Sequence, residues 1–146
     1  MTASAAAVES AWVGEWDLYN EHALAMGSVK EQVLIVDDEV DFRLLVRDLL
    51  EAEGYEVADA GDVQAALALL EDADTVPSVL IVDLRLPGES GWDLIEVVRD
   101  DDRLRRIPII VVSGQPDLDL PPDLHLLVKP VAWEVLSSAI RELCRR

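Results

Sequence analysis

The sequence predicts an α/β protein in which helices cover both faces of a parallel β-sheet. Two features of the 146-residue chain lead to this prediction. Short apolar runs alternate with segments that carry apolar residues at helical spacing. Most of these runs are apolar at successive positions, which indicates strands that are buried on both faces. A parallel sheet between two layers of helices accounts for both features.

Five segments have the character of strands. In most of them an apolar run ends in a polar or charged residue, such as Asp83 after "SVLIV" and Ser113 after "IPIIVV". The second strand is shorter and alternates apolar with polar residues, "YEVADA". The predicted strands are residues 32–38, 55–60, 78–83, 107–113 and 124–129.

Four segments have helical periodicity, and each is expected to turn one apolar face to the sheet. Gly54 is a natural stop for the first helix, and Asp62 can cap the second. The expected inward residues are Phe42, Leu45, Val46, Leu49 and Leu50 in 40–54; Ala66, Leu69 and Leu70 in 63–73; Leu94, Ile95 and Val98 in 91–100; and Val135, Leu136, Ile140 and Leu143 in 131–146.

The connection between the fourth and fifth strands differs from the others. It contains Pro116, Pro121 and Pro122, which disfavour an ordinary helix, so we expect a loop or at most one turn. The remaining crossovers are expected to be right-handed. Together the elements predict a flavodoxin-like, doubly wound, five-stranded parallel sheet with strand order 2-1-3-4-5.

The composition restricts the function classes. The formal net charge is −18, from 30 acidic and 12 basic residues, which argues against direct binding of nucleic acid or insertion into an anionic membrane. Cys144 is the only cysteine, which excludes an internal disulfide. The first residues do not read as a secretory signal, and no apolar run is long enough to span a bilayer. We therefore expect a cytoplasmic protein with protein or cation partners.

Residues 1–31 differ from the rest of the chain, so we predict an N-terminal extension followed by one domain at 32–146. Trp12, Trp16 and Tyr19 recur at helical spacing in the extension, which suits an amphipathic aromatic helix that docks on this domain or on a partner. A tag or frayed tail is the alternative, with Met26 as a possible second start.

Polar residues gather where the predicted strands end. In an open α/β sheet, functional groups collect beyond the carboxyl ends of the strands, near the switch in strand order. Those ends carry Asp37 and Asp38, Asp83, Ser113 and Lys129. Three carboxylates in one pocket repel one another unless a cation intervenes, and Mg²⁺ suits carboxylates and water. Asp37 and Asp38 are alternatively a charge pair favoured by the dipole at the start of a helix.

This set resembles the response-regulator receiver domain of two-component signalling. The matching pieces are "DD" at 37–38, "VDLRLPGESG" at 82–91, "VVSG" at 111–114 and "KP" at 129–130. Each piece alone is a weak signal, and their order and placement at strand ends make the combination specific. The resemblance covers about residues 32–144 and suggests a single-domain type with a shortened fourth-helix region.

The resemblance implies roles for individual residues. Asp83 is the expected phosphoacceptor, which takes a phosphoryl group from a phosphohistidine of a sensor histidine kinase or a histidine phosphotransfer protein. Mg²⁺ is the expected cofactor, bound by Asp38 and Asp83, by the backbone carbonyl of Arg85, and by Asp37 mainly through water. The resemblance also implies that Ser113 and Lys129 contact the phosphoryl group, that Gly114 leaves room for it, and that the Lys129–Pro130 peptide bond is cis.

The sequence departs from the family's pattern at one position and leaves two alternatives open. The family usually has an aromatic residue three positions before the lysine, where this chain has Leu126, so the usual switch is in doubt. One alternative is a Mg²⁺-dependent phosphohydrolase with an aspartyl nucleophile, although Arg85 stands where such enzymes want a second Asp. The other is a pseudo-receiver scaffold that takes no phosphate. We predict a phosphoacceptor signalling domain that is not an enzyme and that assists its own phosphorylation and dephosphorylation. Its phosphorylated state is expected to switch the binding of a downstream protein or to relay the phosphate.

Overall fold

The computed structural model describes residues 30–72 and 76–145, which form five strands and four helices. The predicted aromatic helix lies outside the described residues. Within the described part, no helix is both long and apolar enough to cross a lipid bilayer. In chain order the elements are β1 Gln32–Val36, α3 Val40–Ala52, β2 Glu56–Ala60, α4 Val63–Leu70, β3 Val79–Asp83, α5 Gly91–Asp100, β4 Ile109–Ser113, β5 Leu124–Val128 and α6 Trp133–Cys144.

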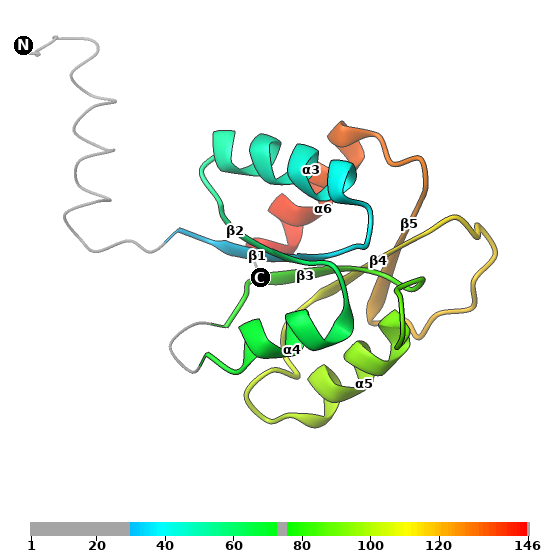
Figure 1. Ribbon diagram of the computed structural model, residues 1–146. Helices are drawn as coiled ribbons and strands as arrows, with labels where there is room; N and C mark the ends of the chain where they lie inside the picture. Colours follow the sequence, from blue (N-terminus) through cyan, green and yellow to red (C-terminus); the bar gives the residue numbers. More distant parts are fainter. Residues whose placement is uncertain (1–29, 73–75, 146) are drawn as a thin grey trace, which may run out of the picture. The chain divides into compact units, whose positions relative to one another are not determined.

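The sheet is parallel throughout and has the order β2-β1-β3-β4-β5, as the sequence predicts. Helices α3 and α6 cover one face of it, and α4 and α5 cover the other (Figure 1). Successive residues of the central strands therefore enter different cores. In β1, Val33 and Ile35 pack with α3 and α6, whereas Leu34 and Val36 pack with α4 and α5. This two-sided burial explains why the strands are apolar without alternation.

Local signals in the sequence begin and end the helices. The Asp62 side chain accepts a hydrogen bond of 2.8 Å from the amide of Ala65 and so caps α4, as predicted. Gly54 follows α3 with a φ of +98°, a conformation that a glycine adopts without strain. At α5, Ser90 and Asp93 form a reciprocal capping box.

The connection between β4 and β5, residues 114–123, contains no helix. This confirms the prediction from its three prolines, which lack the amide hydrogen that a helix interior needs. The loop runs from the carboxyl end of β4 to β5, the edge strand of the sheet (Figure 1). The chain thus reaches its last strand without the helical layer that accompanies the earlier crossovers.

Three residues that the helical pattern places inward are exposed instead. Leu45 of α3, Leu69 of α4 and Val135 of α6 are 58%, 41% and 51% exposed. Helices α3, α4 and α6 bury fewer residues than predicted. In α3, Val46 and Leu50 are buried, while Phe42 and Leu49 are half-buried. Only α5 buries all of its predicted inward residues. Some apolar side chains therefore remain exposed at the margins of the helical layers.

Candidate functional site

The strand register brings the predicted site residues together at one edge of the sheet. Val36 lies opposite Val82, so the residues that follow these two positions, Asp37 and Asp83, are neighbours. On the other side of β3, Asp83 pairs with Val112, the residue before Ser113. The amide of Lys129 donates a hydrogen bond of 2.8 Å to the carbonyl of Ser113.

The carboxylates of Asp37, Asp38 and Asp83 form a compact cluster. One oxygen from each lies within 4.8 Å of one from each of the others. Asp37 and Asp83 are only 1% and 8% exposed, while Asp38 is exposed. This arrangement offers oxygen ligands to a hard divalent cation and leaves an open side for water. The donor set therefore fits Mg²⁺.

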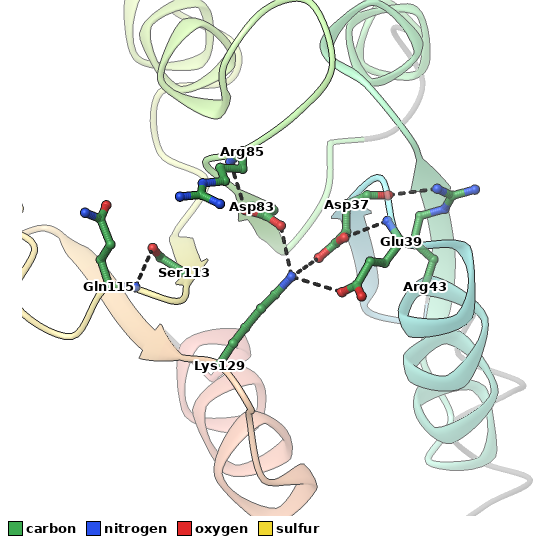
Figure 2. Close-up of polar contacts among 8 residues, drawn as sticks. All are labelled: Asp37, Glu39, Arg43, Asp83, Arg85, Ser113, Gln115 and Lys129. Carbon is green, nitrogen blue, oxygen red and sulfur yellow. Dashed lines mark hydrogen bonds and ion pairs between the residues drawn. The ribbon is translucent and has the colours of Figure 1, made fainter.

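Lys129 extends its ammonium into the same cluster (Figure 2). Its Nζ atom lies 2.9 Å from Asp83 Oδ2, 3.1 Å from Asp37 Oδ2 and 3.3 Å from Glu39 Oε1. The ammonium also lies 5.2 Å from the centre of the Phe42 ring, within the range of a cation–π contact. One cation thus partly neutralises several carboxylates.

The local environment shifts two pKa values in this cluster. Burial raises the pKa of Asp37, and the repulsion from Asp83 adds to it, although the Glu39 amide and Lys129 act in the opposite direction. Burial lowers the pKa of Lys129, but its hydrogen bonds to Asp83 and Asp37 outweigh burial and raise the pKa overall. Lys129 is therefore a permanent cation at neutral pH.

A cleft of about 370 Å³ opens beside Asp83. Ser113 and Lys129 line it, together with Leu84, Arg85, Gly114 and Gln115. The predicted site residues are therefore all at this edge of the sheet. The amide of Arg85 donates a hydrogen bond of 2.9 Å to Asp83 Oδ1, which orients the carboxylate, and the metal role of its carbonyl stays a prediction. The Lys129–Pro130 peptide bond is cis, as the resemblance implies.

The start of α5 packs tightly against the phosphoacceptor candidate. A Cβ atom added to Gly91 would lie 2.4 Å from the carbonyl oxygen of Asp83 and 2.9 Å from Leu84 Cα. Only a glycine permits this approach, and the Gly91 amide donates a hydrogen bond of 3.0 Å to the Leu84 carbonyl. The glycine at the end of "LPGESG" thus fixes the backbone that carries Asp83.

The sequence analysis missed three residues at this edge. Glu39 accepts from Lys129, and the amide of Gln115 donates to Ser113 Oγ at 3.1 Å. Arg43 Nη1 donates a hydrogen bond of 2.8 Å to the carbonyl of Asp37. The position of Glu39 directly after the acid pair is a signal for it. The contacts of Arg43 and Gln115 involve backbone atoms, which the sequence does not mark.

The comparison with known families agrees with this geometry. The family described as the response regulator receiver domain matches residues 33–141. The chain belongs to this family. Receiver domains are signalling domains and are generally not classed as enzymes.

Individual receiver-domain proteins resemble the chain over most of its length. The chemotaxis protein CheY of Pseudomonas aeruginosa is 30% identical over 79% of the chain and 97% of its own length. The sensor histidine kinase TmoS of Ectopseudomonas mendocina is 36% identical over 80% of the chain, which spans only 12% of that kinase. The structure of the chemotaxis response regulator CheY4 of Vibrio cholerae has a TM-score of 0.71 and 26% identity, covering 79% of this chain and 99% of that one.

Proposed function

We propose that residues 32–146 form a phospho-accepting receiver domain, which follows an N-terminal extension at 1–31. We propose further that Asp83 is the phosphoacceptor. One observation carries the proposal. The Asp83 carboxylate lines an open cleft, clusters with two further carboxylates and lies 2.9 Å from the Lys129 ammonium. Membership in the receiver family supports it.

In the proposed reaction, an oxygen of Asp83 attacks the phosphorus of a phosphohistidine. The new O–P bond forms as the N–P bond breaks, and the imidazole leaves with the electron pair of that bond. Charge on the transferred oxygens is stabilised by the Lys129 ammonium and by the Ser113 hydroxyl, which line the same cleft. A Mg²⁺ ion held by Asp37, Asp38 and Asp83 would supply additional positive charge to the phosphoryl oxygens.

We propose that the donor is a sensor histidine kinase or a histidine phosphotransfer protein, because receiver-type relatives include a sensor histidine kinase. A surface beside the cleft suits such a partner. A groove of about 430 Å³ between α3 and α6 is lined by Glu39 and Lys129, and by apolar residues that include Phe42, Leu45 and Trp133. Leu45 is exposed there and available to an apolar helix of the donor.

The phosphoacceptor is tested by incubating the chain with acetyl phosphate and Mg²⁺ and measuring the intact mass. Wild type should gain one phosphoryl group, and Asp83→Asn should gain none. Asp119→Asn is the matched control, because Asp119 is an exposed acid in the loop between β4 and β5, and it should be labelled like wild type. Equal labelling of Asp83→Asn would contradict the site. Absence of labelling in wild type would favour the scaffold alternative, and rapid turnover of a small phosphate ester would favour the phosphohydrolase.

The donor surface is tested with Leu45→Glu. This charge in the groove should slow phosphotransfer from a kinase but leave labelling by acetyl phosphate unchanged, because the small donor needs only the cleft. Leu69→Glu is the control, since Leu69 is also exposed but lies in α4 on the other face of the sheet. Equal effects of both changes on kinase transfer would exclude a specific role for the α3–α6 groove.

A further inference from the structure

Asp37 is held at each of its polar atoms. Its amide donates to the Ala60 carbonyl at 3.0 Å, and its Oδ1 atom accepts from the Glu39 amide at 2.8 Å. Its Oδ2 atom accepts from Lys129, and its carbonyl oxygen accepts from Arg43 Nη1. The Arg43 contact acts on the peptide group that joins Asp37 to Asp38. Two of the three clustered carboxylates are therefore attached to a backbone that Arg43 restrains.

Arg43 is itself fixed in place. Its side chain is 17% exposed, and its Nε atom lies 3.3 Å from Asp59 Oδ1 on β2. Asp59 is 16% exposed and also pairs with Arg47, whose Nη1 atom lies 2.6 Å from Oδ2. Figure 2 shows Arg43 extending from the first turns of α3 back toward Asp37. The guanidinium thus connects β2, α3 and the loop after β1.

The neighbouring backbone leaves space for this guanidinium. A Cβ atom added to Gly61 would lie 3.0 Å from Arg43 Nη1 and 3.7 Å from Cζ. Such a distance is tighter than ordinary contact, so an alanine at position 61 would require the guanidinium to shift by a few tenths of an ångström, and a bulkier side chain would require a larger shift. The lack of a side chain at Gly61 and the hydrogen bond of Arg43 therefore belong to one arrangement.

We propose that Arg43 is a positioning residue for the metal site, and that it acts by holding the Asp37–Asp38 peptide in the orientation that clusters the carboxylates. This inference rests on the proposed Mg²⁺-dependent function. Arg43 donates to a carbonyl and not to the cluster's carboxylates, so it restrains the ligands without competing with a cation for their oxygens. Lys129, in contrast, binds the carboxylates directly.

A purely structural role of Arg43 is the alternative, in which its ion pair with Asp59 only attaches α3 to β2. Arg47 separates the two roles. It pairs with the same carboxylate from the same helix, but within the described part of the chain it donates to Asp59 and Glu51, not to Asp37. Arg47→Met therefore removes an ion pair of the same kind without releasing the loop.

The experiment measures Mg²⁺ affinity of the full chain by isothermal titration calorimetry, with thermal unfolding followed in parallel. Arg43→Met should weaken Mg²⁺ binding by about 10-fold, the loss typical for groups that orient metal ligands. Arg47→Met should leave the affinity within about two-fold, a difference small beside that typical loss. Arg43→Lys should recover part of the affinity. Labelling by acetyl phosphate should return toward wild type at saturating Mg²⁺, because the phosphoacceptor itself is unchanged.

Equal affinities for folded Arg43→Met and wild type would overturn the inference, as would equal losses for the Arg43 and Arg47 variants. If Arg43→Met fails to fold, Gly61→Val provides the decision, because its larger side chain occupies the space of the guanidinium while Arg43 and Asp59 both remain. Unchanged affinity in Gly61→Val would then overturn the inference, and weakened affinity would support it. Failure of wild type to bind Mg²⁺ would instead contradict the proposed function, and the inference with it.

Discussion

Two groups of residues at the proposed phosphoacceptor site, the acids Asp37 and Asp83 and the pair Ser113 and Lys129, are positioned differently. Asp37 and Asp83 are buried, and backbone amides of Glu39 and Arg85 hold their oxygens. Ser113, in contrast, precedes the helix-free loop, and Lys129 follows that loop and β5 and reaches the acids through a long side chain. The comparison indicates that backbone hydrogen bonds and close packing position the acids, whereas Ser113 and Lys129 flank a connection without a helix.

Substitutions of Gly91, which packs against Asp83, and of Gly114, which follows Ser113, test this difference, and the largest loss of stability is expected at Gly91. Gly91→Ala should destabilise the protein by about 3 kcal/mol, because the added carbon collides with backbone atoms that have no room to retreat. Chemical denaturation measures the loss. Gly114→Ala is the control, since a Cβ atom there has no neighbour within 4 Å. Comparable losses for the two variants would contradict the proposed difference in packing.

The Lys129 ammonium is expected to make the next largest contribution to the free energy of unfolding. In the presence of a chelator, Lys129→Met should lower the free energy of unfolding by about 2 kcal/mol, because two buried carboxylates lose their counter-charge. The effect is not larger because the lysine side chain is partly exposed to water. Added Mg²⁺ should restore much of this loss, which thermal unfolding with and without the ion detects. Lys129→Arg keeps the charge and serves as the control. A loss that Mg²⁺ leaves unchanged would show that the lysine stabilises by packing alone.

Removing the charge of Asp37, one of the buried acids, should stabilise the protein moderately. Because burial raises the pKa of Asp37, its ionised form is less favourable in the folded than in the unfolded chain. Asp37→Asn should therefore raise the melting temperature by roughly a few degrees at neutral pH without Mg²⁺, and should weaken Mg²⁺ binding. The asparagine still offers an oxygen to the Glu39 amide.

The pH dependence of this effect follows from the direction of the shift. The cost of ionised Asp37 is fully present above its folded pKa, and it disappears as the pH falls below the ordinary value of 3.8. The advantage of Asp37→Asn should therefore fade on acidification, in melts recorded between neutral and acidic pH. An advantage that persists unchanged at low pH would assign the effect to packing.

The smallest effect is expected at Ser113. Ser113→Ala removes the hydroxyl that accepts from the Gln115 amide, at a cost of about 0.5 kcal/mol because that amide lies at an exposed position and gains water instead. Labelling by acetyl phosphate should nevertheless slow more than stability changes, since the hydroxyl faces the cleft. Ser113→Thr keeps the hydroxyl and should behave like wild type. An unchanged labelling rate in Ser113→Ala would show that Ser113 has no role in phosphoryl transfer and would leave Lys129 as the residue of this pair that acts there.

The sequence predicts those features of the fold and the site that depend on the type of a residue at a single position. Polar residues that end apolar strands identify the edge of the sheet, and the three prolines after Ser113 exclude a helix before β5. Helical periodicity is less informative about which side chains are buried. Leu45 has the spacing of a core residue, but it lies at a groove between two helices that the sequence does not position relative to each other.

The contacts of Arg43 and Gln115 are outside the reach of such patterns for a different reason. Each connects to the site through a backbone group, the carbonyl of Asp37 for the first and its own amide for the second. Every residue has these groups, so they leave no mark in the order of side chains. Asp83, Lys129 and Ser113 are predictable because their chemistry resides in the side chain itself.

The long separation between Lys129 and its partners has a consequence for synthesis. The ammonium meets Asp83 across 46 positions and Asp37 across 92 positions of the chain. A chain emerging from the ribosome therefore contains Asp83, the proposed nucleophile, well before the lysine that completes the cleft. Competence to accept phosphate is then expected to arise only after β5 has joined the sheet, so that incomplete chains do not compete with finished protein for the donor.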